Sequence, residues 1–212
     1  MRRVTRQTLI LTGIGILVFS TLSFAQEGPT AQVKATINRV LDILRDPALK
    51  APEKEEVRRT QLRAVIFTRF DFAEMARRSL GIHWRKRTPK ERKEFVDLFA
   101  DLLERSYHKK LESYTDQEIL YTKEQADKRY GVVRTKIVSE KEHIDIPIDY
   151  KVIRRTGQWK VYDVVVEGVS LVSNYRTQFN RIIQTSSYAN LLRKMRVKQE
   201  AEALSTVPTR KR

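Results

Sequence analysis

The spacing of apolar residues along the chain changes from a helical period to a strand period and back again. Between residues 31 and 111, apolar side chains recur every three or four positions, which predicts helices that each bury one face. Pro, Gly and polar residues interrupt this pattern and separate four expected helices. These helices are expected over residues 31–44, 52–67, 71–80 and 88–111.

Residues 88–91 carry the clearest local signal for a helix start. Thr88 suits the N-cap, Pro89 suits the first helical turn, and Glu91 stands where a capping box needs an acid. The helix that follows has a broad apolar face, which comprises Phe95, Leu98, Phe99, Leu102, Leu103, Tyr107 and Leu111. A long helix with one wide buried face is therefore expected here.

Between residues 118 and 167 the apolar period falls to two, which predicts strands. Short polar turns separate these strands, so an antiparallel meander is expected. The expected strands are 118–123, 130–139, 143–154 and 159–167. One face of the third strand carries Ile144, Ile146, Ile148, Tyr150 and Val152. Pro147 on its other face has no N–H group, which favours an edge strand or a bulge.

Helical periodicity returns over residues 171–183 and 188–204. Ser170 precedes the first of these helices and is a good N-cap residue. Together the patterns predict one α+β domain over residues 26–204, with helices packed on one face of a curved antiparallel sheet. The basic tail over residues 205–212 is expected to be disordered.

The first 25 residues have the three parts of a secretory signal peptide. Three Arg residues precede an apolar run over residues 9–19, and small residues occupy the −3 and −1 positions of a cut after Ala25. An uncleaved membrane anchor is the alternative, but a spanning helix needs about 20 apolar residues. Cleavage of residues 1–25 and export of the mature chain are therefore expected.

Charge narrows the choice of partners. The chain carries 42 Lys and Arg residues against 26 Asp and Glu residues, a formal net charge of +16. Removal of residues 1–25, which hold three Arg and no acid, leaves +13. A basic excess of this size indicates an anionic partner. Because an exported protein seldom meets cellular nucleic acid, the expected partner is a membrane surface or an acidic protein.

Residues that carry catalytic chemistry are few. The absence of Cys excludes disulfides, iron–sulfur clusters, thiolate zinc sites and cysteine nucleophiles. His83, His108 and His143 fall on different expected elements and lack the spacing of a zinc pair. The segment 168–170 begins like the turn of a nucleophilic serine, but Val172 replaces the second glycine of that motif. No enzyme activity and no metal site are expected.

The expected helices carry more aromatic and aliphatic side chains than a small core requires. These side chains either pack as a solid core or line an apolar cavity, and the pattern alone favours a solid core, because apolar stripes at helical spacing are usually buried in one. Basic clusters accompany them, and each either borders such a cavity, faces a membrane or is simply solvated. Arg85, Lys86 and Arg87 lie in the link before the capped helix, where exposure is expected, so they are the candidate docking residues.

Two blocks of the sequence resemble the MlaC family of periplasmic substrate-binding proteins, which includes toluene-tolerance auxiliaries and hopanoid-associated relatives. The first block runs from Phe70 to Tyr107 and contains the segments FDFAEMARRSLG and TPKERKEF. The second runs from Asp149 to Phe179 and contains WKVYD and EGVSL. In order and spacing, the resemblance spans residues 31–195.

The resemblance implies an α+β fold related to NTF2-like domains, with no catalysis and no cofactor, and with a phospholipid as cargo. In family members the acyl chains lie in a pocket between the sheet and the helices. The resemblance also implies transfer through the periplasm, between an outer-membrane lipoprotein–porin complex and an inner-membrane ABC transporter with a ring of MCE domains. The hopanoid-associated branch leaves the lipid class open.

On this basis the acyl chains are expected between the apolar strand face and the neighbouring helical faces. The expected lipid-binding residues are Phe95, Phe99, Leu102, Ile144, Ile146, Ile148, Tyr150, Val172, Tyr175 and Phe179. Two other interpretations remain open at this point. One is a basic adaptor with a solid core, and the other is an enzyme that uses Asp163 and Tyr150 in a small pocket.

Overall fold

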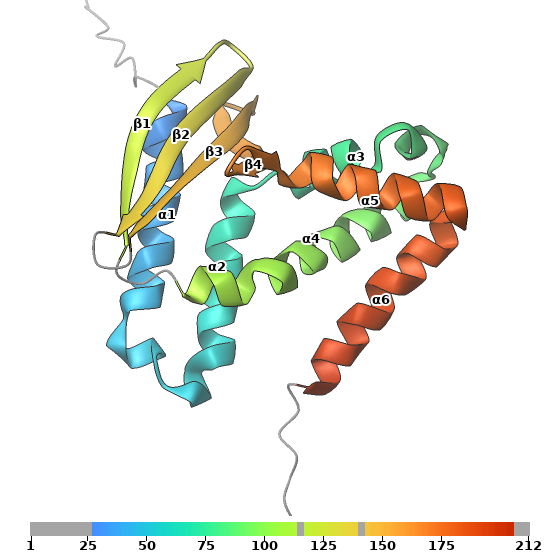
Figure 1. Cartoon of the computed structure of the whole chain (residues 1–212), viewed down its shortest axis with the longest axis horizontal. Coiled ribbons are helices and arrows are strands. Elements are labelled where there is room, and N and C mark those ends of the chain that lie inside the picture. The colour runs from blue at the N-terminus through green and yellow to red at the C-terminus, as the bar shows by residue number, and fades with distance from the viewer. Residues whose placement is uncertain (1–26, 114–116, 140–142, 206–212) are drawn as a thin grey trace, which may run out of the picture.

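The computed structural model describes residues 27–113, 117–139 and 143–205 of the chain (Figure 1). The expected signal peptide lies outside this range, as do residues 206–212 of the expected tail, so both remain predictions. The helices are α1 (Pro29–Arg45), α2 (Glu55–Arg69), α3 (Phe72–Leu80), α4 (Pro89–Glu112), α5 (Leu171–Thr185) and α6 (Tyr188–Ser205). Three short 3-10 turns are η1 (Pro47–Leu49), η2 (Pro52–Lys54) and η3 (Gly81–Lys86). All six helices expected from the apolar spacing are therefore present.

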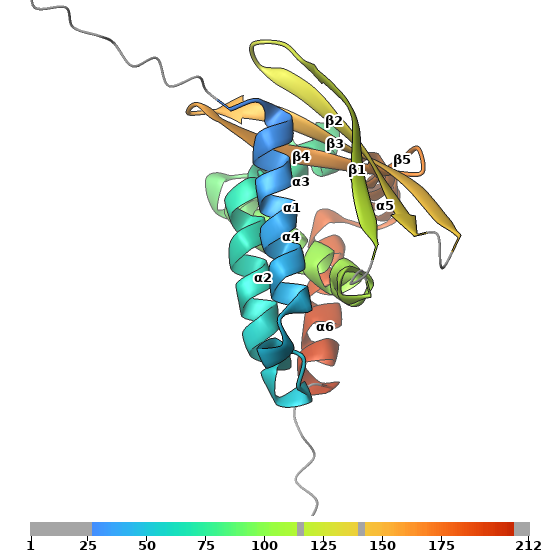
Figure 2. The same cartoon turned by 90° about the vertical axis from the view of Figure 1, so that its left-hand side faces the viewer.

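The strands form one antiparallel sheet in the order β1-β2-β3-β4-β5, so the expected meander is confirmed. Their bounds are β1 (Glu118–Ala126), β2 (Tyr130–Ser139), β3 (Ile144–Arg155), β4 (Gln158–Val166) and β5 (Val169–Ser170). The sheet curves, and α1 lies across it with α2 alongside (Figure 2). The expected α+β class with a curved antiparallel sheet is confirmed.

The prediction of an edge strand at Pro147 is wrong, and the alternative, a bulge, lies elsewhere, because the register of β3 against β4 shifts between Lys151 and Val152 and not at Pro147. β3 lies inside the sheet, paired with β2 on one side and β4 on the other. Ile148 pairs with Val166, the last residue of β4, so position 147 falls beyond the regular β4 ladder. There the Pro147 carbonyl accepts a hydrogen bond of 3.0 Å from the Glu167 amide. The missing N–H group of proline therefore removes no bond from the ladder.

The helix starts follow the local sequence signals. The Thr88 hydroxyl accepts a hydrogen bond from the Glu91 amide at 3.2 Å, and the Glu91 carboxylate accepts one from the Thr88 amide at 2.7 Å. This reciprocal pair is the expected capping box at the start of α4. The Ser170 hydroxyl accepts a hydrogen bond from the Ser173 amide, which confirms Ser170 as the N-cap of α5.

Three apolar clusters result from this arrangement, of which the smallest, Val40, Leu44 and Leu62, lies between α1 and α2 and the two larger ones are described here. In the first, Val33 of α1 packs against one face of the sheet, together with the buried residues Val133, Ile137, Ile148, Val152, Trp159, Val161 and Val164. In the second, α3, α4, α5 and α6 pack around Phe95 and Phe99, both of which are 0 % exposed. The Phe179 ring stands edge-on to both of these rings at 5.6 Å. This second core is therefore solid at its centre.

Candidate functional site

An apolar cavity of about 470 Å³ lies between α2, α4 and the β3–β4 part of the sheet. Its sheet wall is a square of four side chains, because Ile148 is paired with Val166 and Tyr150 with Val164 across the two strands. Alternate residues of a strand share one face, so all four point the same way. Its helical walls comprise Leu62 and Ile66 of α2 and Leu103, Tyr107 and Leu111 of α4.

Three aromatic rings close one end of this cavity. Phe67 and Phe72 have ring centroids 4.4 Å apart, and Phe70 stacks on Phe72 at 5.9 Å. The same three rings line a second hollow of about 590 Å³ on their other side, which also holds Val96 and Ala100. The rings therefore form a partition between two partly apolar spaces.

A row of ion pairs joins α2 to α4 along the border of the cavity. Arg59 bonds Glu104 at 2.8 Å, and Arg63 bonds Asp101 at 3.2 Å and also contacts Glu104. At the far end of the row, Arg58 bonds Glu112 at 2.7 Å. The row gives the apolar cavity a polar border, since Arg59, Arg63 and Glu104 belong to its lining.

Tyr107 brings a neutral hydroxyl to the lining of the cavity. Burial raises the pKa of the Tyr107 hydroxyl above its usual value of 10.0, so the ring stays neutral at physiological pH. Besides the residues of the ion pairs, the polar residues of the lining are His108, Lys110, Glu167 and Asn174. An apolar interior with charged groups at its border suits a molecule with a hydrocarbon body and a polar end.

Only part of the expected lipid-binding set lies at this cavity. Ile148 and Tyr150 line it. Ile146 packs on the same apolar face of the sheet, and the side chain of Ile144 lies outside the described part of the structure. The other six expected residues lie in the helical core and not in the cavity lining, and they are Phe95, Phe99, Leu102, Val172, Tyr175 and Phe179.

Helix geometry explains the different placement of the α4 residues. Each residue advances about 100° around a helix, so neighbouring positions on a broad apolar face point in different directions. The rings of Phe95 and Phe99 contact rings of α5 and α6. Leu102 and Leu103 belong to the same helical core, but of the two only Leu103 also lines the cavity, as does Tyr107. The α2 and β4 linings were missed altogether, although β4 could have been found as the strand that faces Ile148 and Tyr150 across the hairpin.

The candidate docking residues fall into two groups. Arg85 and Lys86 are exposed at the end of η3. Arg87 is half-buried, because it forms an ion pair of 3.1 Å with Glu91 and lies 4.4 Å from the centre of the Tyr188 ring. The first two side chains are available to a partner, while the third stabilises the contact between α4 and α6.

Asp163 and Tyr150 do not share a pocket, which removes the geometry that the enzyme interpretation requires. Tyr150 is paired with Val164, so Asp163 points to the opposite face of the sheet. Asp163 is only 4 % exposed and accepts hydrogen bonds from the Ser170 hydroxyl at 2.7 Å and the Val172 amide at 3.1 Å. Its carboxylate thus stabilises the start of α5.

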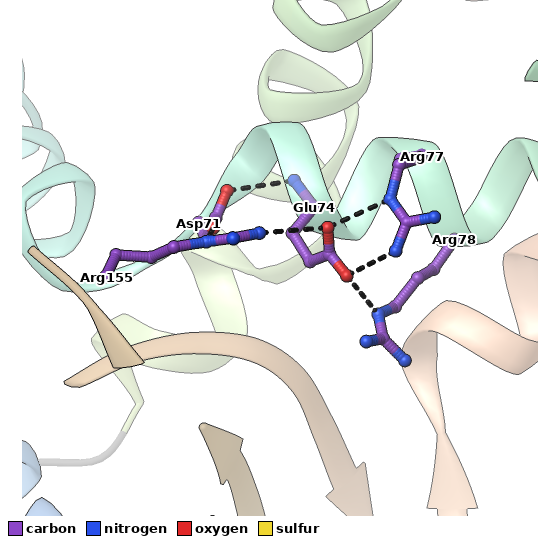
Figure 3. A network of polar contacts seen from close by, with 5 residues as sticks. All are labelled: Asp71, Glu74, Arg77, Arg78 and Arg155. Carbon is purple, nitrogen blue, oxygen red and sulfur yellow. Dashed lines mark hydrogen bonds and ion pairs between the residues drawn. The ribbon is translucent and has the colours of Figure 1, made fainter. Parts of the chain in front are cut away.

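A second buried carboxylate, Glu74 on α3, is surrounded by arginines (Figure 3). Its oxygens accept hydrogen bonds from Arg77 at 2.6 Å, Arg78 at 2.7 Å and Arg155 at 3.2 Å. The hydrogen bonds from Arg77, followed by those from Arg78, lower the pKa of Glu74 to about 2, against the opposing effect of burial. Because Arg155 also bonds Asp71, the network joins α3 to the end of β3.

Within the described ranges, no cluster of three or more His, Asp and Glu residues could hold a metal ion. None of the helices in this part of the chain is both long enough and apolar enough to cross a membrane.

Comparison with known proteins points to one family. The family model for the MlaC protein matches residues 34–197. The intermembrane phospholipid transport system binding protein MlaC of Haemophilus influenzae is 23% identical over 192 residues, which cover 89% of this chain and 88% of that protein. A phospholipid-binding protein from Ralstonia solanacearum, solved in complex with a phospholipid, has a similar structure with a TM-score of 0.74 at 26% identity. That match covers 84% of this chain and 99% of the solved chain.

Proposed function

The chain belongs to the MlaC family, and on this premise we propose that it is a periplasmic carrier that holds a phospholipid by its acyl chains. The proposed partners are an inner-membrane ABC transporter with a ring of MCE domains and an outer-membrane lipoprotein–porin complex. The carrier needs no catalysis and no cofactor, because its task is to keep hydrocarbon out of water while the lipid crosses an aqueous compartment.

One observation carries this proposal, namely the apolar cavity between the sheet and the helices. Each exposed CH₂ group of an acyl chain costs about 0.8 kcal/mol in water, so spontaneous transfer of a lipid is very slow. A cavity walled by Ile148, Val166 and Leu103 removes that cost for the buried part of the chain. The related protein from Ralstonia solanacearum supports the proposal, since it was solved with a phospholipid bound.

We place the acyl chains between the expected sheet face, at Ile148, Tyr150, Val164 and Val166, and the walls formed by α2 and by Leu103, Tyr107 and Leu111 of α4, which take the place of the helical residues first expected. The phosphate end of the lipid would lie at the polar part of the lining, near Lys110 and Asn174. Phe67, Phe70 and Phe72 separate this cavity from the hollow of about 590 Å³ beside it. An acyl chain too long for the cavity would reach these three rings and then the hollow. A cavity of this kind also argues against the interpretation as a basic adaptor with a solid core.

The proposal predicts that the purified protein carries lipid. Mass spectrometry of the intact protein under native conditions should show a mass increase that disappears after organic extraction, because the cavity is costly to leave open to water. The extract identifies the lipid class and separates phospholipid from a hopanoid-related cargo. If several preparations from lipid-rich cells show only the bare polypeptide, the carrier function is wrong.

Docking is predicted to depend on Arg85 and Lys86 rather than on the whole basic cluster. Replacing both with Glu should slow lipid transfer to acceptor membranes that hold the transporter, and should leave bound lipid in place. Charged side chains attract an oppositely charged membrane or protein over about 8 to 10 Å at physiological salt, so they act on docking. Burial of the acyl chains depends on direct contact inside the cavity, so it does not depend on these surface charges. Raising the ionic strength should reduce transfer by the wild type in the same way.

The matched control for this experiment reverses Lys123 and Lys128, which are exposed on β1 and in the turn after it. This variant has the same net charge as the docking variant. Arg87 is left unchanged because its loss would disturb the contact with Tyr188. Equal transfer rates for the two variants would mean that Arg85 and Lys86 are ordinary solvated residues, and loss of lipid would mean that they help to hold it.

A further inference from the structure

A third hollow, of about 800 Å³, opens between the end of α3, η3, α5 and the β3–β4 hairpin. It shares no lining residue with the apolar cavity between α2, α4 and the sheet, which is called the tail cavity from here on. Lys151 and Asp163 line it and are paired across β3 and β4, one position away from the Tyr150–Val164 pair of the tail cavity. Since successive side chains of a strand alternate, the two spaces lie on opposite faces of the sheet.

The lining of this hollow is strongly cationic. It holds Arg77, Arg78, Arg85, Lys151 and Arg176, against the single carboxylate of Asp163. That carboxylate is already engaged by Lys151 at 3.2 Å and by the cap of α5. Arg85 and Arg176 form no ion pair with the described residues. The hollow therefore keeps an excess of positive charge.

The carboxylate behind the hollow does not remove this excess. Glu74 bonds Arg77 and Arg78 of the lining and also Arg155, so one negative charge is shared among three guanidinium groups (Figure 3). Arg78 lies 4.1 Å from the centre of the Tyr162 ring and donates its Nε–H to Glu74, which holds its plane in place. Among the described contacts, its two terminal nitrogens have no hydrogen-bond acceptor.

Two further features shape the hollow for a ligand. Gly81 has a φ angle of +57°, and a Cβ atom there would stand 3.4 Å from Cδ of Arg176. That distance is an ordinary van der Waals contact, so the reason for glycine at this position is the positive φ angle of the turn from α3 into η3, which other residues rarely adopt. Across the hollow, Nε2 of His83 lies 2.9 Å from Oδ1 of Asn180, which leaves the amide N–H groups of Asn180 as additional donors.

We propose that this hollow binds a phosphate group, at a site distinct from the tail cavity. Oriented guanidinium groups with unused N–H donors match the oxygens of a phosphate, and Arg is the preferred residue for such recognition. The phosphate could belong to an anionic phospholipid at a bilayer surface or to a water-soluble phosphate compound. The proposed carrier function does not require this site, although Arg85 belongs to both the docking pair and the hollow.

Two probes test the site on the full mature protein. Inorganic phosphate is titrated while the amide NMR signals of Gly81 and Asn180 are followed. In parallel, co-sedimentation is measured with phosphatidylcholine vesicles that contain or lack phosphatidylglycerol, at one ionic strength. Whichever probe binds the wild type, inorganic phosphate or phosphatidylglycerol vesicles, replacing Arg85 and Arg176 with Glu should weaken its binding by about tenfold or more, because charge-assisted hydrogen bonds are lost.

The control reverses Lys50 and Lys54, which are exposed in the α1–α2 connection at the opposite end of the molecule (Figure 1). It should leave binding within about twofold of wild type, because it changes net charge equally without touching the hollow. A response to phosphatidylglycerol vesicles alone assigns the site to lipid head groups, and a response to phosphate alone assigns it to a soluble compound. A response to both probes supports the general phosphate site.

The proposal is overturned if neither probe binds, which would favour an acidic protein as the occupant of the hollow. It is also overturned if the Lys50 and Lys54 control weakens binding as much as the Arg85 and Arg176 variant, because net charge would then explain the effect. Lipid in the tail cavity is measured in the same preparations. Phosphate binding by a protein that never carries lipid would refute the carrier function and leave this site standing.

Discussion

Replacing Val166 with Asp is expected to empty the tail cavity of lipid while the protein stays folded. Val166 lines the cavity beside Ile148 and is only half-buried, so a carboxylate there can keep water in the empty protein. Bound hydrocarbon would strip that water, and the cost of several kcal/mol should lower lipid affinity by about a hundredfold or more. Native mass spectrometry measures the occupancy, and circular dichroism measures the fold.

Two comparison variants make this result decisive. Val166→Ile keeps the wall apolar and should retain lipid. Phe99→Asp should unfold the protein, because Phe99 is 0 % exposed and its ring lies 5.3 Å from Tyr175 and 5.6 Å from Phe179. A buried unpaired charge costs about 5 kcal/mol or more, which is comparable to the whole free energy of unfolding of a typical domain.

The opposite result for the two Asp variants would place the lipid elsewhere in the protein. A folded Phe99→Asp protein without lipid, together with a Val166→Asp protein that keeps its lipid, would mean that the acyl chains enter the helical core. The helical part of the lining first expected would then be correct, and the assignment to the sheet cavity would be wrong.

Replacing Glu74 with Gln is expected to lower the free energy of unfolding by about 3 kcal/mol at pH 7. The side chain is 5 % exposed, and its charge is stabilised by Arg77, Arg78 and Arg155 in the folded protein. Gln keeps the shape of the side chain but cannot match the charge of these arginines. Denaturant titrations of both proteins measure the difference.

The pH dependence of this difference carries a defined sign. The folded-state pKa of Glu74 is about 2, below the ordinary value of 4.5. The stabilisation is therefore complete above about pH 4.5 and is lost as the pH falls towards 2, as the carboxylate takes up a proton. The gap between wild type and Glu74→Gln should narrow over that range, and a gap that stays constant with pH would contradict the ion-pair explanation.

An exposed ion pair provides the control for Glu74. Lys93 and Asp97 are bonded at 2.7 Å on α4, with side chains 79% and 61% exposed. Because solvent screens such pairs, Asp97→Asn should change the free energy of unfolding by no more than about 0.5 kcal/mol. A larger loss would mean that removal of any acid destabilises this basic protein, and that the position of Glu74 is not special.

Features that depend on a few neighbouring residues could be predicted from the sequence. The capping box of Thr88 and Glu91 is one such feature, because both partners lie within a single helical turn. The shared face of Ile148, Tyr150 and Val152 is another, because side chains alternate along any strand. Family membership followed from two ordered blocks of sequence and needed no coordinates.

The sequence by itself therefore determined the six helices, the antiparallel meander, the α+β class and the family. Only the tertiary structure decided that, of the α4 core residues, Leu103 also lines the cavity and Phe99 does not, because a wide apolar face does not indicate which neighbour each of its residues will contact. It also decided that Pro147 lies inside the sheet, beyond the end of β4. Both outcomes depend on which elements, distant in the sequence, pack against these residues. The hydrophobic effect drives that packing, and because it is non-directional, it does not specify which apolar faces will meet.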